Sequence, residues 1–125
     1  MPAKIINISV ERGDSLRIEF TLDKEDTIEV GDAFFTVRKY ITDKDFILQK
    51  TKGNGITKDE GEPNSYIITL LPTETRKMEL GKYYYDIEIV MPHETGAADD
   101  VCTIAKGTFE VLWDITRHSE ASAEG

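Results

Sequence analysis

GKYYYDIEIVMP, residues 81–92, places three consecutive tyrosines at the head of an apolar stretch. Successive side chains of a strand point to opposite faces, so one face would carry Tyr83, Tyr85, Ile87 and Ile89. The other face would carry Tyr84, Asp86, Glu88 and Val90, and its two carboxylates predict contact with water. Two rings are therefore expected to point inward and one outward, which excludes a single aromatic platform for a ligand.

The residues around these tyrosines, ELGKYYY at 79–85, resemble the tyrosine corner of immunoglobulin-like β-sandwiches. In that corner a Tyr near the start of a strand hydrogen-bonds the backbone a few residues upstream. The resemblance implies that Tyr83 is the corner residue and that Gly81 permits the turn. It also implies that Tyr85 occupies the core position of the second cysteine of antibody domains. The chain departs from those domains because its single cysteine is Cys102 and its single tryptophan, Trp113, lies on the last expected strand.

Outward from this segment, the dominant hydrophobic period is two, which is typical of half-buried antiparallel strands. Strands are expected at residues 5–12, 15–22, 33–41, 45–51, 65–71, 82–91, 101–106 and 108–115. RGDS at 12–15 and the Asn-Gly pair within 53–55 predict tight turns, and Pro72 can begin one or two turns of helix. Seven to nine short strands with such turns indicate an antiparallel sandwich or a small barrel.

We therefore expect an all-β fold, a two-sheet antiparallel immunoglobulin-like β-sandwich with one short helical turn. The sandwich domain would span residues 1–116, and residues 117–125 would form a flexible polar tail. The core is expected to contain Leu16, Ile18, Phe20, Tyr85, Ile87, Ile89, Phe109, Val111 and Trp113.

The composition restricts the classes of partner. The 125 residues carry a net charge of −9, and a nucleic acid or an acidic membrane surface repels such a chain. The single cysteine excludes an intramolecular disulfide, and no stretch matches a signal peptide or a membrane span. The sequence thus predicts synthesis in a reducing cytoplasm, with no nucleic acid and no membrane as partner.

Candidate catalytic and metal-binding groups are few. His93, His118 and Cys102 lie in separate segments, so no enzyme activity and no catalytic residue is predicted. Carboxylates cluster at Asp23, Glu25 and Asp26, at Asp43 and Asp45, at Asp59, Glu60 and Glu62, and at Asp99 and Asp100. None of these clusters matches a calcium loop, although two loops together could assemble a site. No metal, no cofactor and no cofactor-binding residue is predicted, and the RGD tripeptide is explained as a turn.

A carbohydrate site would need several exposed rings on one face of a sheet. The outward-facing aromatic residues are Tyr84 and one of Phe34 and Phe35, because those two neighbours must point to opposite faces. Tyr84 and the loops 23–32 and 92–100 are the candidate contact regions, and no residue is assigned to an interface.

The later part of the chain is similar to small β-sandwich domains of phage and prophage virion proteins. The shared pattern is a strand ending in Leu, a Pro- and Thr-started turn, Gly-x-Tyr-x-Tyr-Asp-Ile, a Thr-containing strand, and Gly-x-Phe-x-Val before Asp-Ile-Thr. Its residues are Leu70, Pro72, Thr75, Gly81, Tyr83, Tyr85, Asp86, Ile87, Thr103, Gly107, Phe109, Val111, Asp114, Ile115 and Thr116. RGDSLRIEFTL and GDAFFTVRK look like the same family, so the resemblance covers most of residues 5–116.

This resemblance implies a non-catalytic structural or assembly component of a phage or prophage particle, associated with the tail or baseplate. Its partners would be other virion or prophage structural proteins or a second copy of the chain, and its final location the virion. The alternative is a free-standing recognition module that binds a surface glycan or a protein partner. An assembly module needs only a rigid shape, free edge strands and loops, whereas a glycan module needs coplanar exposed rings.

Overall fold

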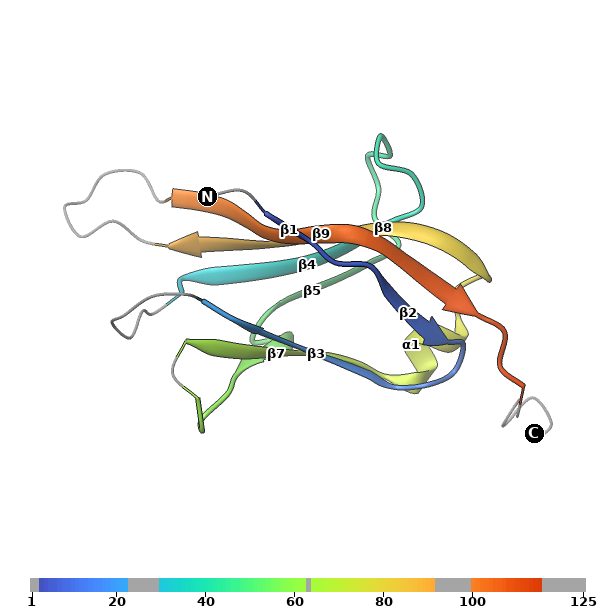
Figure 1. Ribbon diagram of the computed structural model, residues 1–125, viewed down its shortest axis with the longest axis horizontal. Coiled ribbons are helices and arrows are strands. Elements are labelled where there is room, and N and C mark those ends of the chain that lie inside the picture. The colour runs from blue at the N-terminus through green and yellow to red at the C-terminus, as the bar shows by residue number, and fades with distance from the viewer. Residues whose placement is uncertain (1–2, 23–29, 63, 92–99, 116–125) are drawn as a thin grey trace.

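The computed structural model describes residues 3–22, 30–62, 64–91 and 100–115, which form nine strands and one short helix (Figure 1). The elements are β1 (Lys4–Ile5), β2 (Ile8–Glu11), β3 (Leu16–Thr21), β4 (Asp32–Arg38), β5 (Leu48–Lys52), β6 (Gly55–Lys58), β7 (Ser65–Leu70), α1 (Pro72–Arg76), β8 (Gly81–Met91) and β9 (Asp100–Leu112). The prediction of an all-β fold with one short helical turn is confirmed. The expected tail, 117–125, lies outside the described residues.

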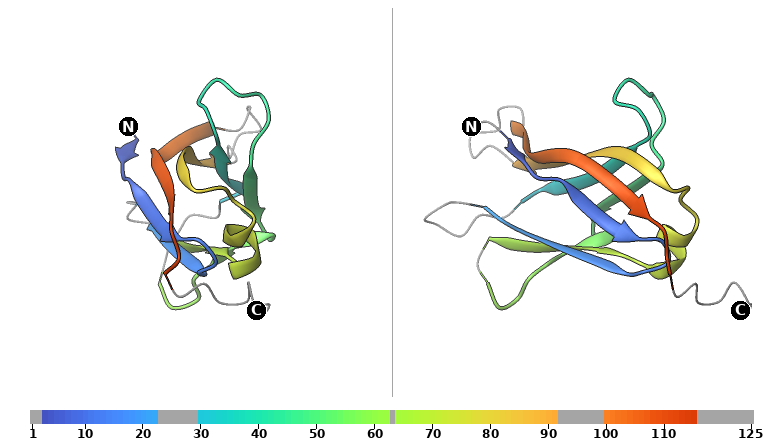
Figure 2. Two further views of the ribbon diagram at one scale, coloured as in Figure 1. Left: turned by 90° about the vertical axis from the view of Figure 1, so that its right-hand side faces the viewer. Right: turned by 45° about the vertical axis from the view of Figure 1, so that its right-hand side comes forward.

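The strands join in one connected sheet with the order β1-β9-β8-β4-β5-β6-β7-β3, and β2 also pairs with β9. The sheet curls, so that β3 and β7 lie opposite β4, β8 and β9 with the core between them (Figure 1 and Figure 2). Pairing is mixed, because β1 and β2 run parallel to β9 and β5 runs parallel to β6. The prediction of antiparallel pairing throughout is therefore wrong at these two places, and the strands form one curled sheet.

A tight turn follows β5, as the Asn-Gly pair within 53–55 predicts, because the Thr51 N–H donates to the Asn54 carbonyl at 3.1 Å and the Asn54 N–H donates to the Thr51 carbonyl at 2.8 Å. Gly53 and Gly55 have φ angles of 90° and 101°, a region that residues with a Cβ atom rarely adopt. A Cβ atom on Gly55 would also clash with the side chain of Lys50. The chain turns away from β5 after only two residue pairs, and β6 then pairs antiparallel with β7.

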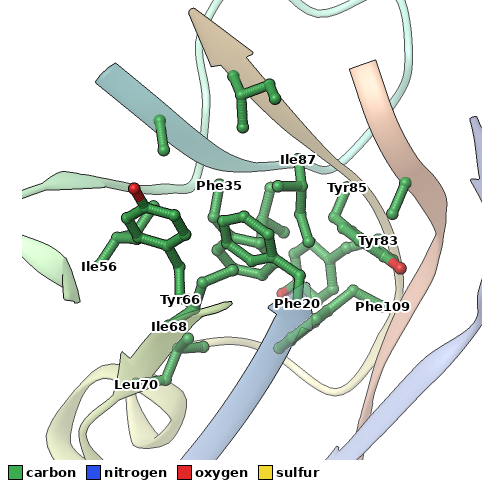
Figure 3. Packing of buried hydrophobic residues seen from close by; sticks show 14 of the residues in the cluster. Phe20, Phe35, Ile56, Tyr66, Ile68, Leu70, Tyr83, Tyr85, Ile87 and Phe109 are labelled. Atoms are coloured by element: carbon green, nitrogen blue, oxygen red, sulfur yellow. The ribbon is translucent and has the colours of Figure 1, made fainter. Parts of the chain in front are cut away.

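Aromatic rings join the two halves of the curled sheet in a continuous core (Figure 3). Phe20 from β3 stacks on Tyr66 from β7 with a distance of 5.5 Å between ring centroids. In the other half, Phe35 of β4 contacts the rings of Tyr85 and Phe109 at centroid distances of 5.6 Å and 6.2 Å. These tilted and stacked arrangements are the favourable geometries for aromatic pairs, so the rings stabilise the contact between strands distant in sequence.

Most of the predicted core residues are buried. The confirmed residues are Phe20, Tyr85, Ile87, Ile89, Phe109 and Val111, and Leu16 and Ile18 are partly buried against them. Trp113 is 52% exposed, so its predicted place in the core is wrong. The physical reason is that β9 ends at Leu112, and the alternation of inward and outward side chains does not continue beyond the strand.

The predicted strands around residue 43 are too long. The expected strands 33–41 and 45–51 correspond to Asp32–Arg38 and Leu48–Lys52, and residues 39–47 form a loop instead. This loop stands away from the sheet on the side opposite β3 and β7 (Figure 1 and Figure 2). The Asp43 carboxylate accepts a hydrogen bond from the Tyr40 N–H at 3.1 Å, which closes a turn there. The strands expected at 101–106 and 108–115 are in fact the single strand β9.

The predicted tyrosine corner is confirmed. The Tyr83 hydroxyl donates a hydrogen bond to the Glu79 carbonyl at 2.8 Å, and Gly81 adopts a φ of 132° in the turn between them. Tyr85 is also buried, and its hydroxyl donates to the Ile6 carbonyl at 2.7 Å. Both inward-pointing tyrosines therefore satisfy their polar end with a backbone carbonyl.

Tyr83→Phe should lower the free energy of unfolding by roughly 1–3 kcal/mol, because it leaves the Glu79 carbonyl without its donor in a partly buried place. Tyr84→Phe is the matched control and should change stability little, since within the described residues the Tyr84 hydroxyl makes no hydrogen bond. Urea denaturation of the three proteins measures both values. Equal, negligible effects would contradict the corner's contribution to stability.

The short helix α1 is tied to two distant parts of the chain. Glu74 accepts a hydrogen bond from the Leu71 N–H at 2.8 Å and pairs with the Lys50 ammonium of β5 at 2.5 Å. Thr75 is fully buried, and its hydroxyl accepts from the Gly13 N–H at 3.0 Å and donates to the Asp14 carbonyl at 2.8 Å. The RGD tripeptide is therefore a turn that α1 fixes in place, as the sequence predicts.

Glu74→Gln should destabilise the fold by roughly 1–3 kcal/mol at neutral pH, because it leaves the buried Lys50 ammonium without a counter-charge. Partial burial alone would raise the pKa of Glu74, but the hydrogen bonds from Leu71 and Lys50 outweigh it, so the pKa lies below its ordinary value of 4.5. The stability from this carboxylate is thus present above that value and lost as pH falls through the folded pKa.

Denaturation of wild type and Glu74→Gln at several pH values tests this expectation. The difference between them should be largest at neutral pH and should shrink in acid, where the wild-type carboxyl is protonated. Glu60→Gln, an exposed carboxylate in the loop after β6, is the control and should change stability little. A Glu74→Gln difference that does not depend on pH would contradict the ionic contribution.

Candidate functional site

The outer face of β4, β8 and β9, which faces away from the core, carries a groove of about 890 Å³. We call it the outer groove and define its floor by Phe34 and Arg38 of β4, Tyr84, Asp86 and Glu88 of β8, and Lys106 of β9. Its volume lies within the usual range of ligand and peptide pockets. The outer groove is therefore the candidate functional site.

Strand register sets the order of side chains along the floor. Arg38 pairs with Tyr84, and two residues further along β8 Asp86 pairs with both Thr36 and Lys106. Glu88 pairs with Phe34 in the next row. The floor thus presents an aromatic ring towards each end and an acidic side chain beside a basic one at its centre.

The outward aromatic residues that the sequence predicted are now placed. Tyr84 lines the outer groove as expected, and Phe34 lines it as well, whereas Phe35 is fully buried in the core. The two rings share one face but belong to different strands and are separated by the Asp86 row.

One wall of the outer groove is formed by Ile5 of β1 and by Asn7, which lies between β1 and β2. The Asn7 side chain accepts a hydrogen bond from the Thr108 N–H at 3.1 Å, and the Ile6 N–H donates to the Lys106 carbonyl at 2.9 Å. A Cβ atom on Gly107 would clash with the Ile6 carbonyl, so this wall can lie against β9 only where a glycine is present.

The opposite wall contains Ile41 and Asp43 of the loop 39–47, which we call the apolar loop. This loop exposes four large apolar side chains, Tyr40, Ile41, Phe46 and Ile47, by 60%, 74%, 49% and 50%. Its backbone is held by hydrogen bonds from Arg38 Nε to the Asp43 carbonyl at 3.0 Å and from the Ile47 N–H to the Val37 carbonyl at 2.7 Å. Grouped apolar exposure of this kind marks interaction sites, and here the loop is already ordered.

Asp86 is the titratable group at the centre of the outer groove. Burial raises the pKa of the Asp86 carboxyl above its ordinary value, while the positive charges of Arg38 and Lys106 act in the opposite direction. Within the described residues its carboxylate accepts no hydrogen bond. A perturbed group in a groove is a candidate for contact with a ligand or partner.

The acidic clusters in the described part of the chain show no metal site. Asp43 closes the turn of the apolar loop, and Asp59 lies beside Glu19 of β3. The hydrogen bond with Asp59 raises the pKa of Glu19, and desolvation and the charges of Asp59 and Glu62 add to this. Over residues 3–22, 30–62, 64–91 and 100–115, no group of three or more His, Cys, Asp or Glu side chains could hold a metal ion.

The remaining predicted groups are dispersed or undescribed. Cys102 is half-buried on β9, and its thiol lies 3.9 Å from the Thr103 carbonyl. His93, His118, Asp23, Glu25, Asp26 and Asp99 lie outside the described residues, as do most of the loops 23–32 and 92–100. No helix in the described part of the chain is long and apolar enough to cross a membrane.

No protein-family model matches the chain, and no curated protein matches it. Among solved structures, a candidate glycoside hydrolase from Bacteroides vulgatus is 20% identical, with a TM-score of 0.44 over 89% of this chain. This chain spans only 17% of the length of that protein. The extracellular domain of the voltage-gated sodium channel beta4 subunit is 12% identical, with a TM-score of 0.40 over 92% of this chain and 97% of its own.

Asp86→Asn should raise the free energy of unfolding at neutral pH, because a neutral amide avoids the desolvation of a partly buried carboxylate. A raised folded pKa means that Asp86 favours folding below its unfolded value of 3.8, and that this contribution is lost as pH rises through the folded pKa. The gain of the variant over wild type should therefore grow from about pH 3 to pH 7 in urea denaturation. A gain independent of pH would contradict the raised pKa.

Proposed function

We propose that this protein is a non-catalytic immunoglobulin-like β-sandwich that binds protein partners through its outer groove and apolar loop. In this proposal it is a structural or assembly component of a phage or prophage particle, associated with the tail or baseplate. The observation that carries the proposal is the apolar loop, with its four exposed large side chains on an ordered backbone.

Strand order supports the immunoglobulin-like description. The run β9-β8-β4-β5 and the run β6-β7-β3 correspond to the two sheets of such a sandwich, and only two residue pairs connect β5 to β6. The hydrogen bond from Tyr83 to Glu79 supports the same description, because it matches the tyrosine corner of these domains.

The chemistry of the apolar loop favours a protein partner. Burial of one exposed Ile or Phe side chain contributes roughly 1.5–3 kcal/mol, so four such side chains can form the centre of an interface. The loop contains Lys39 and Lys44 together with Asp43 and Asp45, and it is therefore neutral in a chain of net charge −9. A neutral apolar surface suits a protein partner, whereas an acidic membrane surface would repel the chain as a whole because of its net charge.

The lining of the outer groove supports a non-catalytic role. Among the described residues that line it there is no Ser, Cys or His, so the groove holds no Ser–His or Cys–His pair of a nucleophile and its base. The resemblance of the sequence pattern over most of residues 5–116 to virion domains supports tail or baseplate proteins as the partners, with synthesis in the cytoplasm and a final place in the virion.

A second candidate function is recognition of a surface glycan. The observation in its favour is that Phe34 and Tyr84 share the outer groove with the amides of Asn7 and Gln49, the combination of ring and amide that binds sugars. The Gln49 amide already donates to the Thr36 hydroxyl at 3.0 Å, and Asn7 accepts from Thr108, so both amides are partly engaged within the protein. We therefore place this function second.

Co-expression of the chain with the products of the adjacent genes tests the proposal. The chain should co-purify with a tail or baseplate protein, and the double variant Ile41→Ser, Phe46→Ser should weaken that complex by roughly a hundredfold, about tenfold per side chain. Ile115→Ser is the control, because Ile115 is 90% exposed and lies outside the loop. Two results together would favour the second candidate. The double variant would leave any complex with a tail or baseplate protein unchanged, and the chain would bind glycans on an array in a way that Tyr84→Ala abolishes.

A further inference from the structure

We propose that the partner of the outer groove is a second copy of this chain, docked face to face about a two-fold axis parallel to the strands between β8 and β9. This inference rests on the proposed function and names the partner of the same site. Three features of the face are self-complementary about that axis: its central charges, its two walls and its order of strands.

The central charges are the first feature. Asp86 of β8 and Lys106 of β9 are directly paired across the two strands, one on each side of the axis. A half-turn about the axis exchanges the two strands and places Asp86 of one copy over Lys106 of the partner subunit. Two equal contacts of opposite charge form, as an isologous interface requires. Each supplies a cation to a carboxylate that accepts no hydrogen bond within the described residues.

The walls are the second feature. Ile5 on one wall is 68% exposed, and Ile41 on the other wall is 74% exposed. The same half-turn brings the apolar loop of each copy to Ile5 of β1 in the other copy. Both copies would then bury apolar side chains that a monomer leaves in water.

The order of strands is the third feature. From the axis, β8 and then β4 follow on one side, and β9 and then β1 follow on the other. The half-turn therefore places β4 of one copy over β1 of the other, with the apolar loop just beyond β4. Because β1 is at the edge of the sheet in the described chain, the loop can reach past it without meeting another strand.

Sedimentation velocity of the full chain tests this inference, at concentrations up to roughly 1 mM, which reveals even weak association. Salt of about 0.15 M screens the net charge of the two copies. The wild type should show a dimer fraction that rises with concentration. Asp86→Lys and Lys106→Asp should each abolish it, since each puts like charges in contact, and an equimolar mixture of the two variants should restore a dimer.

Glu60→Lys, which changes the charge by the same amount as Asp86→Lys in the exposed loop after β6, should leave the dimer unchanged. A wild type that is monomeric at every concentration overturns the inference, and so does a dimer that persists in both charge variants. If circular dichroism shows that a charge variant is unfolded, the dissociation constant of the Ile41→Ser dimer is measured instead. A dissociation constant raised roughly tenfold or more supports the inference, and an unchanged one overturns it.

This outcome can be separated from that of the proposed function. A monomeric wild type that still co-purifies with a tail or baseplate protein through the apolar loop overturns only the second copy as partner. A dimer that follows the expected charge pattern but binds no virion protein supports this inference and contradicts the phage assignment.

Discussion

The two inward tyrosines of β8 impose the constraint on which much of the structure depends. A buried phenol must donate its hydrogen bond, and in each case the acceptor is a backbone carbonyl, Glu79 for Tyr83 and Ile6 for Tyr85. The first bond shapes the turn that leads from α1 into β8. The second holds the N-terminal segment against β9, where Gly107 leaves the space for it. One wall of the outer groove thus exists because the core needs an acceptor for Tyr85.

The alternation of side chains predicts which residues face the core, but not which strand lies beside which. It correctly separates Tyr83 and Tyr85 from Tyr84, and it places Phe109 and Val111 inside. It carries no information on direction, so the parallel pairing of the N-terminal strands with β9 could not be predicted. That pairing depends on the approach of Ile6 to Gly107, a contact between residues 101 positions apart. The alternation also predicts Trp113 in the core, because it does not show where β9 ends; tertiary contacts decide that.

The candidate site was harder to predict than the fold. The sequence predicts Tyr84 as an outward ring and Phe34 as one of two alternatives, but the register of β4 and β9 against β8 decides which other residues line the groove. The apolar loop was missed because Tyr40, Ile41, Phe46 and Ile47 have the composition of strand residues. The signal that could have found it is TDKD at 42–45, in which Asp43 closes a turn between them. Two apolar segments separated by a turn that an Asp side chain closes can form an exposed loop as well as a β-hairpin.

The apolar loop is also the part of the structure that folding does not explain. The core is complete without Ile41 and Phe46. Their side chains expose apolar surface to water, which polar residues at these positions would avoid. The hydrogen bonds of Arg38, Asp43 and Ile47 fix the backbone of the loop and thereby keep these side chains exposed. Without these hydrogen bonds the loop could instead pack the side chains against the sheet. An ordered backbone loses little further entropy on association, so the order itself favours binding. We therefore interpret the apolar loop as the partner-binding surface of the proposed function, and because it lies beside the outer groove the two together form the proposed site.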